Sequence, residues 1–302
     1  MKQFWPGYLQ KYKAGDLEVR TRLLLGKLKA CSLCPWRCRV DRIAGERGQC
    51  KTARLARVHS FMPHHGEERP LRGHGGSGTI FFSGCNLHCV YCQNSDISQG
   101  NYGSEVEAEK IADMMISLQD WGCHNINLVS PTHVVPQIFE ALLIATNRGL
   151  NLPLVYNTGG YDSLSTLKLL DGIIDIYMPD MKYAQPSTAS RYSGVNDYPI
   201  INQLAVKEMH RQVGDLIIND QGYAQRGLLI RHLLLPGQLE ATKNILQFIY
   251  KEISKDTYVN IMSQYRPEYQ ANLFPEINFP IKKSAYDEAI RYAHEIGLHR
   301  LD

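Results

Sequence analysis

The sequence predicts an α/β protein built on a partial (β/α)6 barrel of parallel strands. From residue 79 onward, short apolar segments of strand length alternate with longer segments of helical periodicity. Such alternation is typical of right-handed βαβ units in a parallel sheet. No G-x-G-x-x-G motif follows the first apolar segment, which disfavours a dinucleotide-binding Rossmann domain. Six strands suit either an open doubly wound sheet or an incomplete barrel, and the residues at the strand ends, described below, favour the barrel.

The strands and helices are read from periodicity and from the glycine, proline and polar residues that bound them. The six expected strands cover residues 79–85, 125–130, 153–160, 173–182, 227–237 and 258–267. The expected helices cover residues 104–122, 136–149, 163–172, 202–214, 239–254 and 283–297. In the first helix, Ser104 and Glu107 predict a capping box. Its expected buried face consists of Ile111, Met114, Met115, Leu118 and Trp121.

Three regions follow from this pattern. Residues 1–77 form a cysteine-rich N-terminal extension that ends in the loop "MPHHGEERPLRGHGGSG". Residues 78–270 form the barrel, and residues 271–302 form a C-terminal helical extension. The N-terminal extension is expected to pack against the barrel, because a segment rich in loop buries little apolar surface alone.

Composition excludes several classes of protein. The chain has 302 residues, of which 44% are hydrophobic and 21% charged, and its net charge of +3 indicates no nucleic-acid footprint. No apolar run approaches the roughly 18 residues of a membrane helix. The first 20 residues lack the apolar core of a signal peptide, so a cytoplasmic protein is expected. In a reducing compartment, the eight cysteines favour metal binding over disulfides.

Three cysteines follow the first strand in "GCNLHCVYCQN", with the spacing C-x3-C-x2-C. They are Cys85, Cys89 and Cys92. A structural zinc site normally closes with four ligands, and an ordinary iron–sulfur cluster takes four cysteines. Three thiols leave one metal position open, which is where substrate chemistry takes place.

Polar residues also follow the other strands. In a (β/α) barrel the C-terminal strand ends carry the active site. These ends hold Ser130, Thr132 and His133; Asn157, Thr158, Gly159 and Gly160; Asp180 and Lys182; Arg231 and His232; and Ser263, Gln264, Tyr265 and Arg266. Strand ends are often polar because they meet solvent, but that does not explain three thiols at fixed spacing.

This pattern resembles the radical S-adenosylmethionine (SAM) superfamily, in which C-x3-C-x2-C follows the first strand and an aromatic residue, here Tyr91, precedes the third cysteine. "VYNTGG", "MPDMK" and "IRHLLLPG" look like strand segments of pyruvate formate-lyase activating enzymes. "SGTIFFSGCNLHCVYCQN" with "NINLVSPTH" looks like an uncharacterised branch of activating-enzyme-like proteins. The resemblance covers most of residues 65–270.

The resemblance implies a radical SAM oxidoreductase. Cys85, Cys89 and Cys92 would hold three irons of a [4Fe–4S] cluster, and the fourth iron would chelate the amine and carboxylate of SAM. Reductive cleavage would yield a 5′-deoxyadenosyl radical that abstracts hydrogen from the substrate. The residues implied to bind SAM are Tyr91, Thr132, Asn157, Thr158, Asp180, Lys182 and Arg231. Lys182 would neutralise the methionine carboxylate, and Asp180 would anchor Lys182 or a cation.

Two departures from the family pattern matter. "SPTH" stands where activating enzymes usually have Gly-Gly-Glu, so Thr132 or the backbone would meet the SAM amino group, and His133 could face substrate. Asn157 replaces the first residue of an Asp-Thr pair. The first change weakens any direct transfer of the family's substrate to this chain.

The N-terminal extension carries a second cysteine set, Cys31, Cys34, Cys38 and Cys50, spaced C-x2-C-x3-C-x11-C. Four reduced thiols within 20 residues suggest zinc or a second iron–sulfur cluster with a structural role. Inert free thiols are the alternative. Cys123 stands alone and is expected in the core, and His64, His65 and His74 are expected in a solvated loop.

Three functions stay open at this point. The first is activation of a glycyl-radical enzyme, with a backbone glycine of a partner protein as the substrate. The second keeps SAM cleavage but acts on a small molecule, a peptide or another protein side chain. The third is a non-catalytic iron–sulfur electron carrier or metal-binding module, which would not need SAM-orienting Asp, Lys and Arg residues. Either enzyme would need a low-potential electron donor of the flavodoxin or ferredoxin type.

Overall fold

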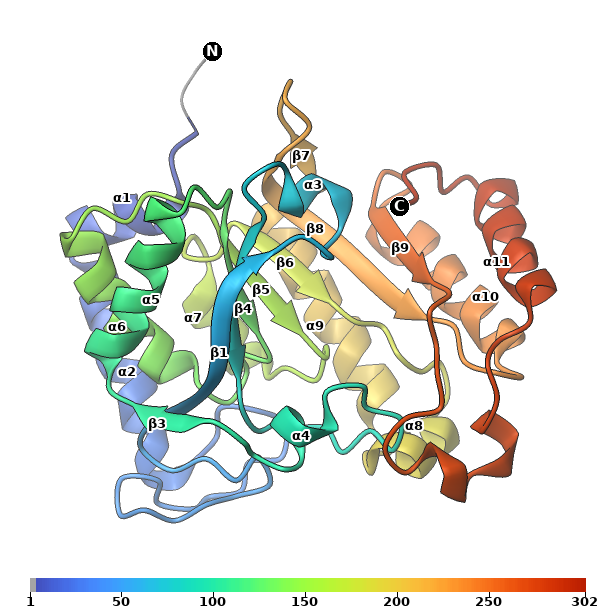
Figure 1. Cartoon of the computed structure of the whole chain (residues 1–302), viewed down its shortest axis with the longest axis horizontal. Helices are drawn as coiled ribbons and strands as arrows, with labels where there is room; N and C mark the ends of the chain where they lie inside the picture. Colours follow the sequence, from blue (N-terminus) through green and yellow to red (C-terminus); the bar gives the residue numbers. More distant parts are fainter. Residues whose placement is uncertain (1–3) are drawn as a thin grey trace.

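Six parallel strands form the centre of the computed structural model, which describes residues 4–302 (Figure 1). They pair in the order β2–β4–β5–β6–β8–β9. Their bounds are β2 (Ser77–Phe82), β4 (Ile126–Val129), β5 (Leu154–Thr158), β6 (Ile176–Pro179), β8 (Ala224–Leu233) and β9 (Tyr258–Met262). Among residues 4–302 no pairing joins β9 back to β2, so the barrel stays open. This arrangement confirms the predicted partial barrel of six parallel strands.

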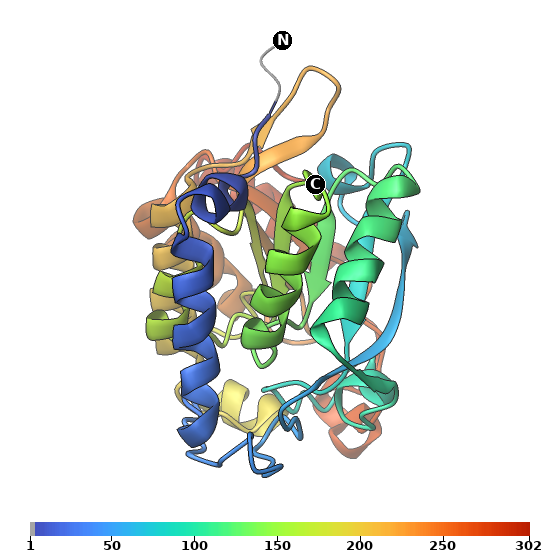
Figure 2. The ribbon, with the colours of Figure 1, turned by 90° about the vertical axis from the view of Figure 1, so that its left-hand side faces the viewer.

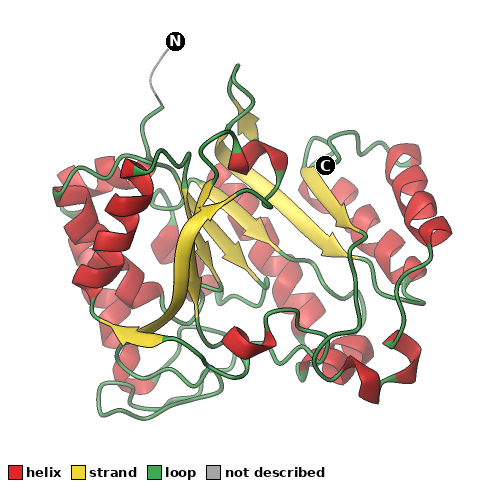
Figure 3. Ribbon diagram, viewed as in Figure 1, coloured by secondary structure: helices red, strands yellow, loops and turns green. Residues whose placement is uncertain are grey.

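Helices cover the outer face of the strands (Figure 3). They are α5 (Ala108–Asp120), α6 (Val135–Asn147), α7 (Leu164–Leu170), α9 (Tyr198–Val213), α10 (Leu239–Phe248) and α11 (Lys283–Glu295), whereas α8 (Pro186–Ser193) lies at the C-terminal strand ends. Leucine, isoleucine, valine and methionine side chains between these helices and the strands form the main core. The predicted helices are all present, and α11 of the C-terminal extension packs against α10. No helix within residues 4–302 has the length and apolarity needed to cross a membrane.

The predicted capping box at Ser104 is wrong. Ser104 lies in a short strand, β3 (Ser104–Val106), and pairs with Val58, while α5 begins at Ala108 without a side-chain cap. The free edge of the neighbouring strand offers backbone hydrogen bonds that override the local capping preference. Four of the five residues expected on the buried face of α5 are buried, but Trp121 is 54% exposed and stacks on Phe61.

The N-terminal extension contains more regular structure than its sequence indicates. It forms α1 (Gly7–Lys13), α2 (Asp16–Gly26), β1 (Ala56–His64) and α3 (Arg69–Arg72). Helices α1 and α2 lie against α6 (Figure 2). Strand β1 pairs antiparallel with β2 at the open edge of the barrel, and also with β3. The extension therefore packs on the barrel along much of its length. Residues 1–3 lie outside the described part, and boundaries at 77/78 and 270/271 stay predictions.

The two ends of the barrel differ. Helix α3 covers the N-terminal ends of the strands, where Leu71 joins a buried cluster with Val155 and Ile176. The strand β7 (Ile217–Ile218) pairs with β8 at the same end (Figure 1). The C-terminal strand ends point towards α8 and the short helix α4 (Ser95–Ser98), where a second cluster rich in tyrosine is buried. Short 3-10 or π-helical segments cover residues 27–30, 249–253, 271–273 and 275–277.

Candidate active site

The loop after β2 places Cys85, Cys89 and Cys92 at the C-terminal end of the barrel. Gly84 begins this loop with φ +83°, and a Cβ there would lie 2.5 Å from the carbonyl oxygen of Cys50, so only glycine fits. The middle of the loop is held by the end of α8, because the backbone N–H of Val90 donates to the carbonyl of Tyr192 at 2.9 Å. The position of the loop that carries the three thiols is therefore fixed by contacts at Gly84 and at Val90.

Each of the three sulfur atoms has a polar neighbour. The backbone N–H of Leu87 donates to Cys85 Sγ at 3.4 Å, Ser193 Oγ donates to Cys89 Sγ at 2.9 Å, and Ser98 Oγ lies 3.2 Å from Cys92 Sγ. Burial raises the pKa of the Cys85 thiol to about 12 and also raises that of Cys89. Since thiolate is the form that binds metal, iron binding here must displace protons from buried thiols.

A cavity of about 390 Å³ opens beside these thiols. Its volume lies within the range of small-molecule and cofactor sites. It is lined by the three cysteines of the loop, by residues from β1, β2, β4, β5, β8 and β9, and by Asp180 and Lys182 directly after β6. Among the residues predicted to bind SAM, those that line it are Tyr91, Asn157, Thr158, Asp180, Lys182 and Arg231. The barrel brings these positions, separated by up to 140 residues of sequence, to one wall.

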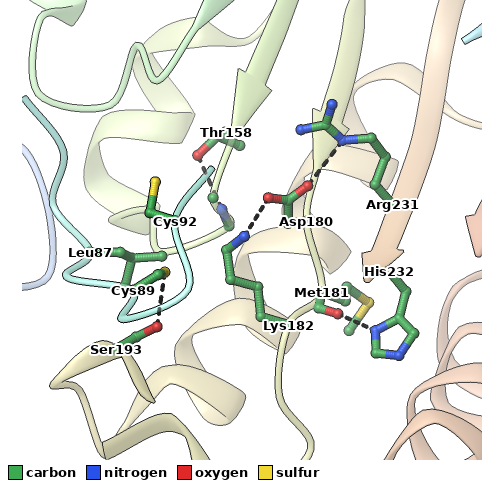
Figure 4. A network of polar contacts seen from close by, with 12 residues as sticks. Leu87, Cys89, Cys92, Thr158, Asp180, Met181, Lys182, Ser193, Arg231 and His232 are labelled. Atoms are coloured by element: carbon green, nitrogen blue, oxygen red, sulfur yellow. Dashed lines mark hydrogen bonds and ion pairs between the residues drawn. The ribbon is translucent and has the colours of Figure 1, made fainter. Parts of the chain in front are cut away.

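Asp180 is the centre of that wall (Figure 4). Its Oδ2 accepts a hydrogen bond from Lys182 Nζ at 2.6 Å, and its Oδ1 accepts one from Arg231 Nε at 3.0 Å. Arg231 Nη2 also donates to Asn157 Oδ1 at 2.7 Å. The two cations are thereby fixed in direction before any ligand binds.

Charge pairing affects the pKa values of Asp180 and Lys182 more strongly than burial does. Burial alone would raise the pKa of Asp180, but Arg231 and Lys182 hold it below its usual value. Burial alone would lower the pKa of Lys182, but Asp180 reverses that effect and raises it. All three groups are therefore charged at neutral pH, and their side chains are 13–17% exposed.

Thr132 lies behind the wall and does not line the cavity. Its Oγ1 donates to Asp162 Oδ1 at 2.7 Å and lies 3.1 Å from Thr158 Oγ1, while Asp162 also accepts from the hydroxyl of Tyr156 at 3.0 Å. Thr132 therefore supports Thr158, which does face the cavity. Its predicted contact with the SAM amino group stays a prediction. Gly160 crosses the same region with φ +77°, where a Cβ would lie 2.3 Å from the carbonyl oxygen of Asp180.

Two histidines of the strand ends are structural. His133 is buried, with Nε2 2.9 Å from the carbonyl oxygen of Ser83, and burial lowers its pKa to about 4. His232 lies between the carbonyl of Met181 at 2.6 Å and the hydroxyl of Thr242 at 2.8 Å, and burial lowers its pKa to about 4. His232 is therefore a buried histidine of the barrel wall and does not line the cavity. The idea that His133 faces substrate is not supported, because it does not line the cavity.

The N-terminal extension supplies site residues that the sequence analysis missed. Glu67 and His64 line the cavity, although His64 was expected in a solvated loop. Glu67 Oε1 lies 3.6 Å from Arg231 Nη1, and its Oε2 accepts from Asn127 Nδ2 at 2.5 Å. Burial raises the pKa of Glu67, against the opposing effect of Arg231. The only sequence feature that could have indicated this role is the pair Glu67–Glu68 within a glycine-rich loop. The sequence does not show that this loop reaches the cavity.

The second cysteine set lies beside the loop that holds Cys85, Cys89 and Cys92, where Cys50 contacts Gly84. Cys31, Cys34 and Cys50 are buried, and Cys38 is half-buried. Burial raises the pKa of the Cys34 thiol well above its usual value, and the other three thiols add to that effect, so the four lie near one another. Within residues 4–302 no group of three or more His, Cys, Asp or Glu side chains is arranged around a single metal ion, either here or among the three thiols after β2. Metal binding at this set stays a prediction.

The donor set after β2 fits a [4Fe–4S] cluster with one open iron. In such a cluster each thiolate binds a different iron, so three sulfurs need not converge on one point as zinc ligands must. Cys85, Cys89 and Cys92 all face one cavity, and each sulfur has an N–H or O–H group within 3.4 Å. The same cavity presents Lys182 and Arg231, which suit the carboxylate of SAM.

Two comparisons of the sequence with known proteins give matches. The model of the radical SAM superfamily matches residues 79–210. An uncharacterized protein of Methanocaldococcus jannaschii, MJ0674, is 32% identical over 300 residues, which cover 96% of this chain and 82% of that protein.

Two solved structures are similar to part of this chain. SuiB of Streptococcus suis is 12% identical with a TM-score of 0.49, over 73% of this chain and 46% of SuiB. The protein anSMEcpe, solved with bound AdoMet and a peptide, is 10% identical with a TM-score of 0.49, over 70% of this chain and 56% of its own. The chain thus spans about half the length of these solved proteins. Together, the three-cysteine loop and the segment matched by the superfamily model show that this chain belongs to the radical SAM superfamily.

Proposed function

We propose that this protein cleaves SAM reductively and uses the resulting 5′-deoxyadenosyl radical to abstract hydrogen from a substrate. One observation carries the proposal: the three thiols and the Asp180–Lys182–Arg231 wall face the same cavity. When bound, a [4Fe–4S] cluster with an open iron supplies the electron that splits SAM into methionine and the radical. A non-catalytic electron carrier would have no use for a cavity with two fixed cations beside its cluster.

The residues of this chain would bind and orient SAM. Lys182 and Arg231 would attract its carboxylate, and Asp180 would hold both cations at the required angle. Thr158 and Asn157 would offer hydrogen bonds from the end of β5, and the ring of Tyr91 would cover part of the cofactor. The barrel wall would keep water and other hydrogen donors away from a radical that attacks whatever it reaches.

The substrate would lie at the inner end of the cavity. His64 and Glu67 line this end, whereas Phe81, beside the last residue of β2, and Met262, the last residue of β9, line the cavity nearer the cysteines. His64 pairs with Ser77, the first residue of β2, whereas the thiols follow the last residue of that strand. This end is therefore remote from the cysteines along β2 and would remain open when SAM occupies the rim.

Two substrate classes follow. Activation of a glycyl-radical enzyme, with a backbone glycine as the target, is the first. The buried carboxylate of Glu67 favours the second, a polar group of a small molecule, peptide or protein side chain, because glycine offers no side chain for Glu67 to bind. In either case a flavodoxin- or ferredoxin-type protein would donate the electron, and the cytoplasm would keep the thiols reduced.

The decisive experiment is anaerobic SAM cleavage. The reconstituted protein is reduced with dithionite, SAM is added, and 5′-deoxyadenosine is measured by mass spectrometry. Wild type and Cys123→Ser should form it, since Cys123 is buried in the main core away from the cavity. Cys89→Ser should form none. Absence of 5′-deoxyadenosine from iron-loaded wild type would leave the electron-carrier function, and a glycyl-radical signal after adding a candidate partner would identify the first substrate class.

A further inference from the structure

Three hydroxyl groups form a chain that ends on the sulfur of Cys89. The hydroxyl oxygens of Tyr91 and Tyr183 are 2.7 Å apart, Tyr183 Oη lies 2.6 Å from Ser193 Oγ, and Ser193 Oγ donates to Cys89 Sγ at 2.9 Å. Figure 4 shows the last of these contacts. The exposed fractions of Cys89, Tyr91 and Tyr183 are 8%, 5% and 4%, and Ser193 is fully buried. Water therefore competes little for these hydrogen bonds.

The direction of the chain follows from the number of protons. An iron-bound cysteine is a thiolate, which accepts hydrogen bonds and donates none. When Ser193 donates its one proton to Cys89, its oxygen can only accept from Tyr183. Tyr183 then accepts from Tyr91. All three O–H groups consequently point towards the sulfur, and hydrogen bonds aligned in this way strengthen one another.

The three hydroxyls come from three separate elements. Tyr91 lies within the cysteine loop, Tyr183 follows Lys182 at the end of β6, and Ser193 is the last residue of α8. Gly194 ends α8 with φ +73°, a left-handed conformation that glycine adopts without strain. The fold therefore brings the chain of hydroxyls to Cys89 by tertiary packing rather than by the local spacing of the cysteine motif.

We propose that Ser193, supported by Tyr183 and Tyr91, raises the reduction potential of the cluster held by Cys89. Reduction adds one electron and no proton, and part of the added negative charge lies on the cysteine sulfurs. A donated hydrogen bond stabilises the sulfur more in the reduced state, and hydrogen bonds to sulfur are among the features that set cluster potentials. This inference rests on the proposed [4Fe–4S] cluster, and it assigns Ser193 a positioning and tuning role rather than contact with SAM.

The test is a redox titration of the reconstituted protein without SAM, with dithionite as the one-electron reductant and the reduced cluster measured by EPR. Ser193→Ala should lower the ratio of reduced to oxidised cluster about tenfold at a fixed potential, which corresponds to about 59 mV for one electron. Tyr183→Phe should shift the curve in the same direction by less. Tyr192→Phe is the matched control, because its hydroxyl lies in the same aromatic cluster but donates to Glu276 at 3.0 Å. Its curve should coincide with that of wild type.

Iron content separates the outcomes. Wild type without iron would overturn both the proposed function and this inference. A Ser193→Ala protein with about four irons and an unshifted curve would overturn the inference alone. If Ser193→Ala does not retain its iron, Tyr183→Phe decides, because it leaves the contact between Ser193 and Cys89 in place. An unshifted Tyr183→Phe curve, or an equal shift in Tyr192→Phe, would then refute the chain of hydroxyls.

Discussion

Replacing Asp180 with asparagine should destabilise the protein by about 3 kcal/mol before any cofactor binds. The Asp180 carboxylate lies 2.6 Å from Lys182 Nζ and 3.0 Å from Arg231 Nε, and the three side chains are at most 17% exposed. Removing one partner of a buried ion pair costs about 3–5 kcal/mol, because an uncompensated charge stays behind. Asparagine keeps one acceptor oxygen, so the low end of that range applies. Arg231 retains Glu67 at 3.6 Å, but among residues 4–302 Lys182 has no other carboxylate within 4.0 Å.

The assay is urea unfolding of the metal-free protein, followed by circular dichroism and compared at equal slope of the transition. Asp113→Asn is the matched control. Asp113 pairs with Arg148 at 2.6 Å, but these side chains are 50% and 43% exposed. Exposed pairs contribute about 0–1 kcal/mol, so this control should change stability by less than about 1 kcal/mol. Equal destabilisation by the two substitutions would refute the view that Asp180 compensates two buried cations.

Three further predictions test the site and the core. Cys89→Ser should abolish the iron-dependent visible absorbance while circular dichroism stays that of wild type; an unchanged spectrum of the loaded protein would contradict the cluster ligands. Lys182→Ala should weaken SAM binding by about 1.5–3 kcal/mol, measured by titration of the reconstituted protein, and unchanged affinity would remove its role. Burial raises the pKa of Asp175 from 3.8 to about 7, so the folded state holds a proton that the unfolded state has lost. Stability should therefore fall by up to about 4 kcal/mol between pH 4 and 7, and unfolding curves of Asp175→Asn should lack this part of the pH dependence.

The barrel could be predicted because its strands carry local signals. The apolar runs of β4, β5 and β6 are fully or almost fully buried, as expected for strands covered on both faces. Because parallel strands end on the same side, the polar residues after them could be placed on one rim without knowing the strand order. Asp180, Lys182, Asn157 and Arg231 were predicted on this basis, and the structure brings them together at one wall.

The capping box at Ser104 shows where such signals fail. The residues have the right identity and spacing, but Ser104 pairs with Val58, 46 positions earlier in the sequence. An unpaired edge of β1 outweighs one side-chain cap, and nothing near Ser104 in the sequence indicates that edge. Thr132 is a similar case. Its position after β4 is as predicted, but the direction of its hydroxyl depends on the buried carboxylate of Asp162, which the sequence does not indicate.

Arg231 shows most clearly what the sequence could predict and what it could not. An arginine within "LLIRHLLL" must have buried partners, because an isolated charge inside the barrel would be too costly. The requirement is local, but the partners are distant: Asn157 and Asp180 come from two neighbouring strands, and Glu67 comes from the N-terminal extension. The position of Glu67 depends on the segment before α3, whose Leu71 is buried in a cluster with Val155 and Ile176. An arginine in an apolar strand therefore predicts that anions lie near it. Only the folded structure shows that one of these anions is Glu67, 164 residues earlier in the chain.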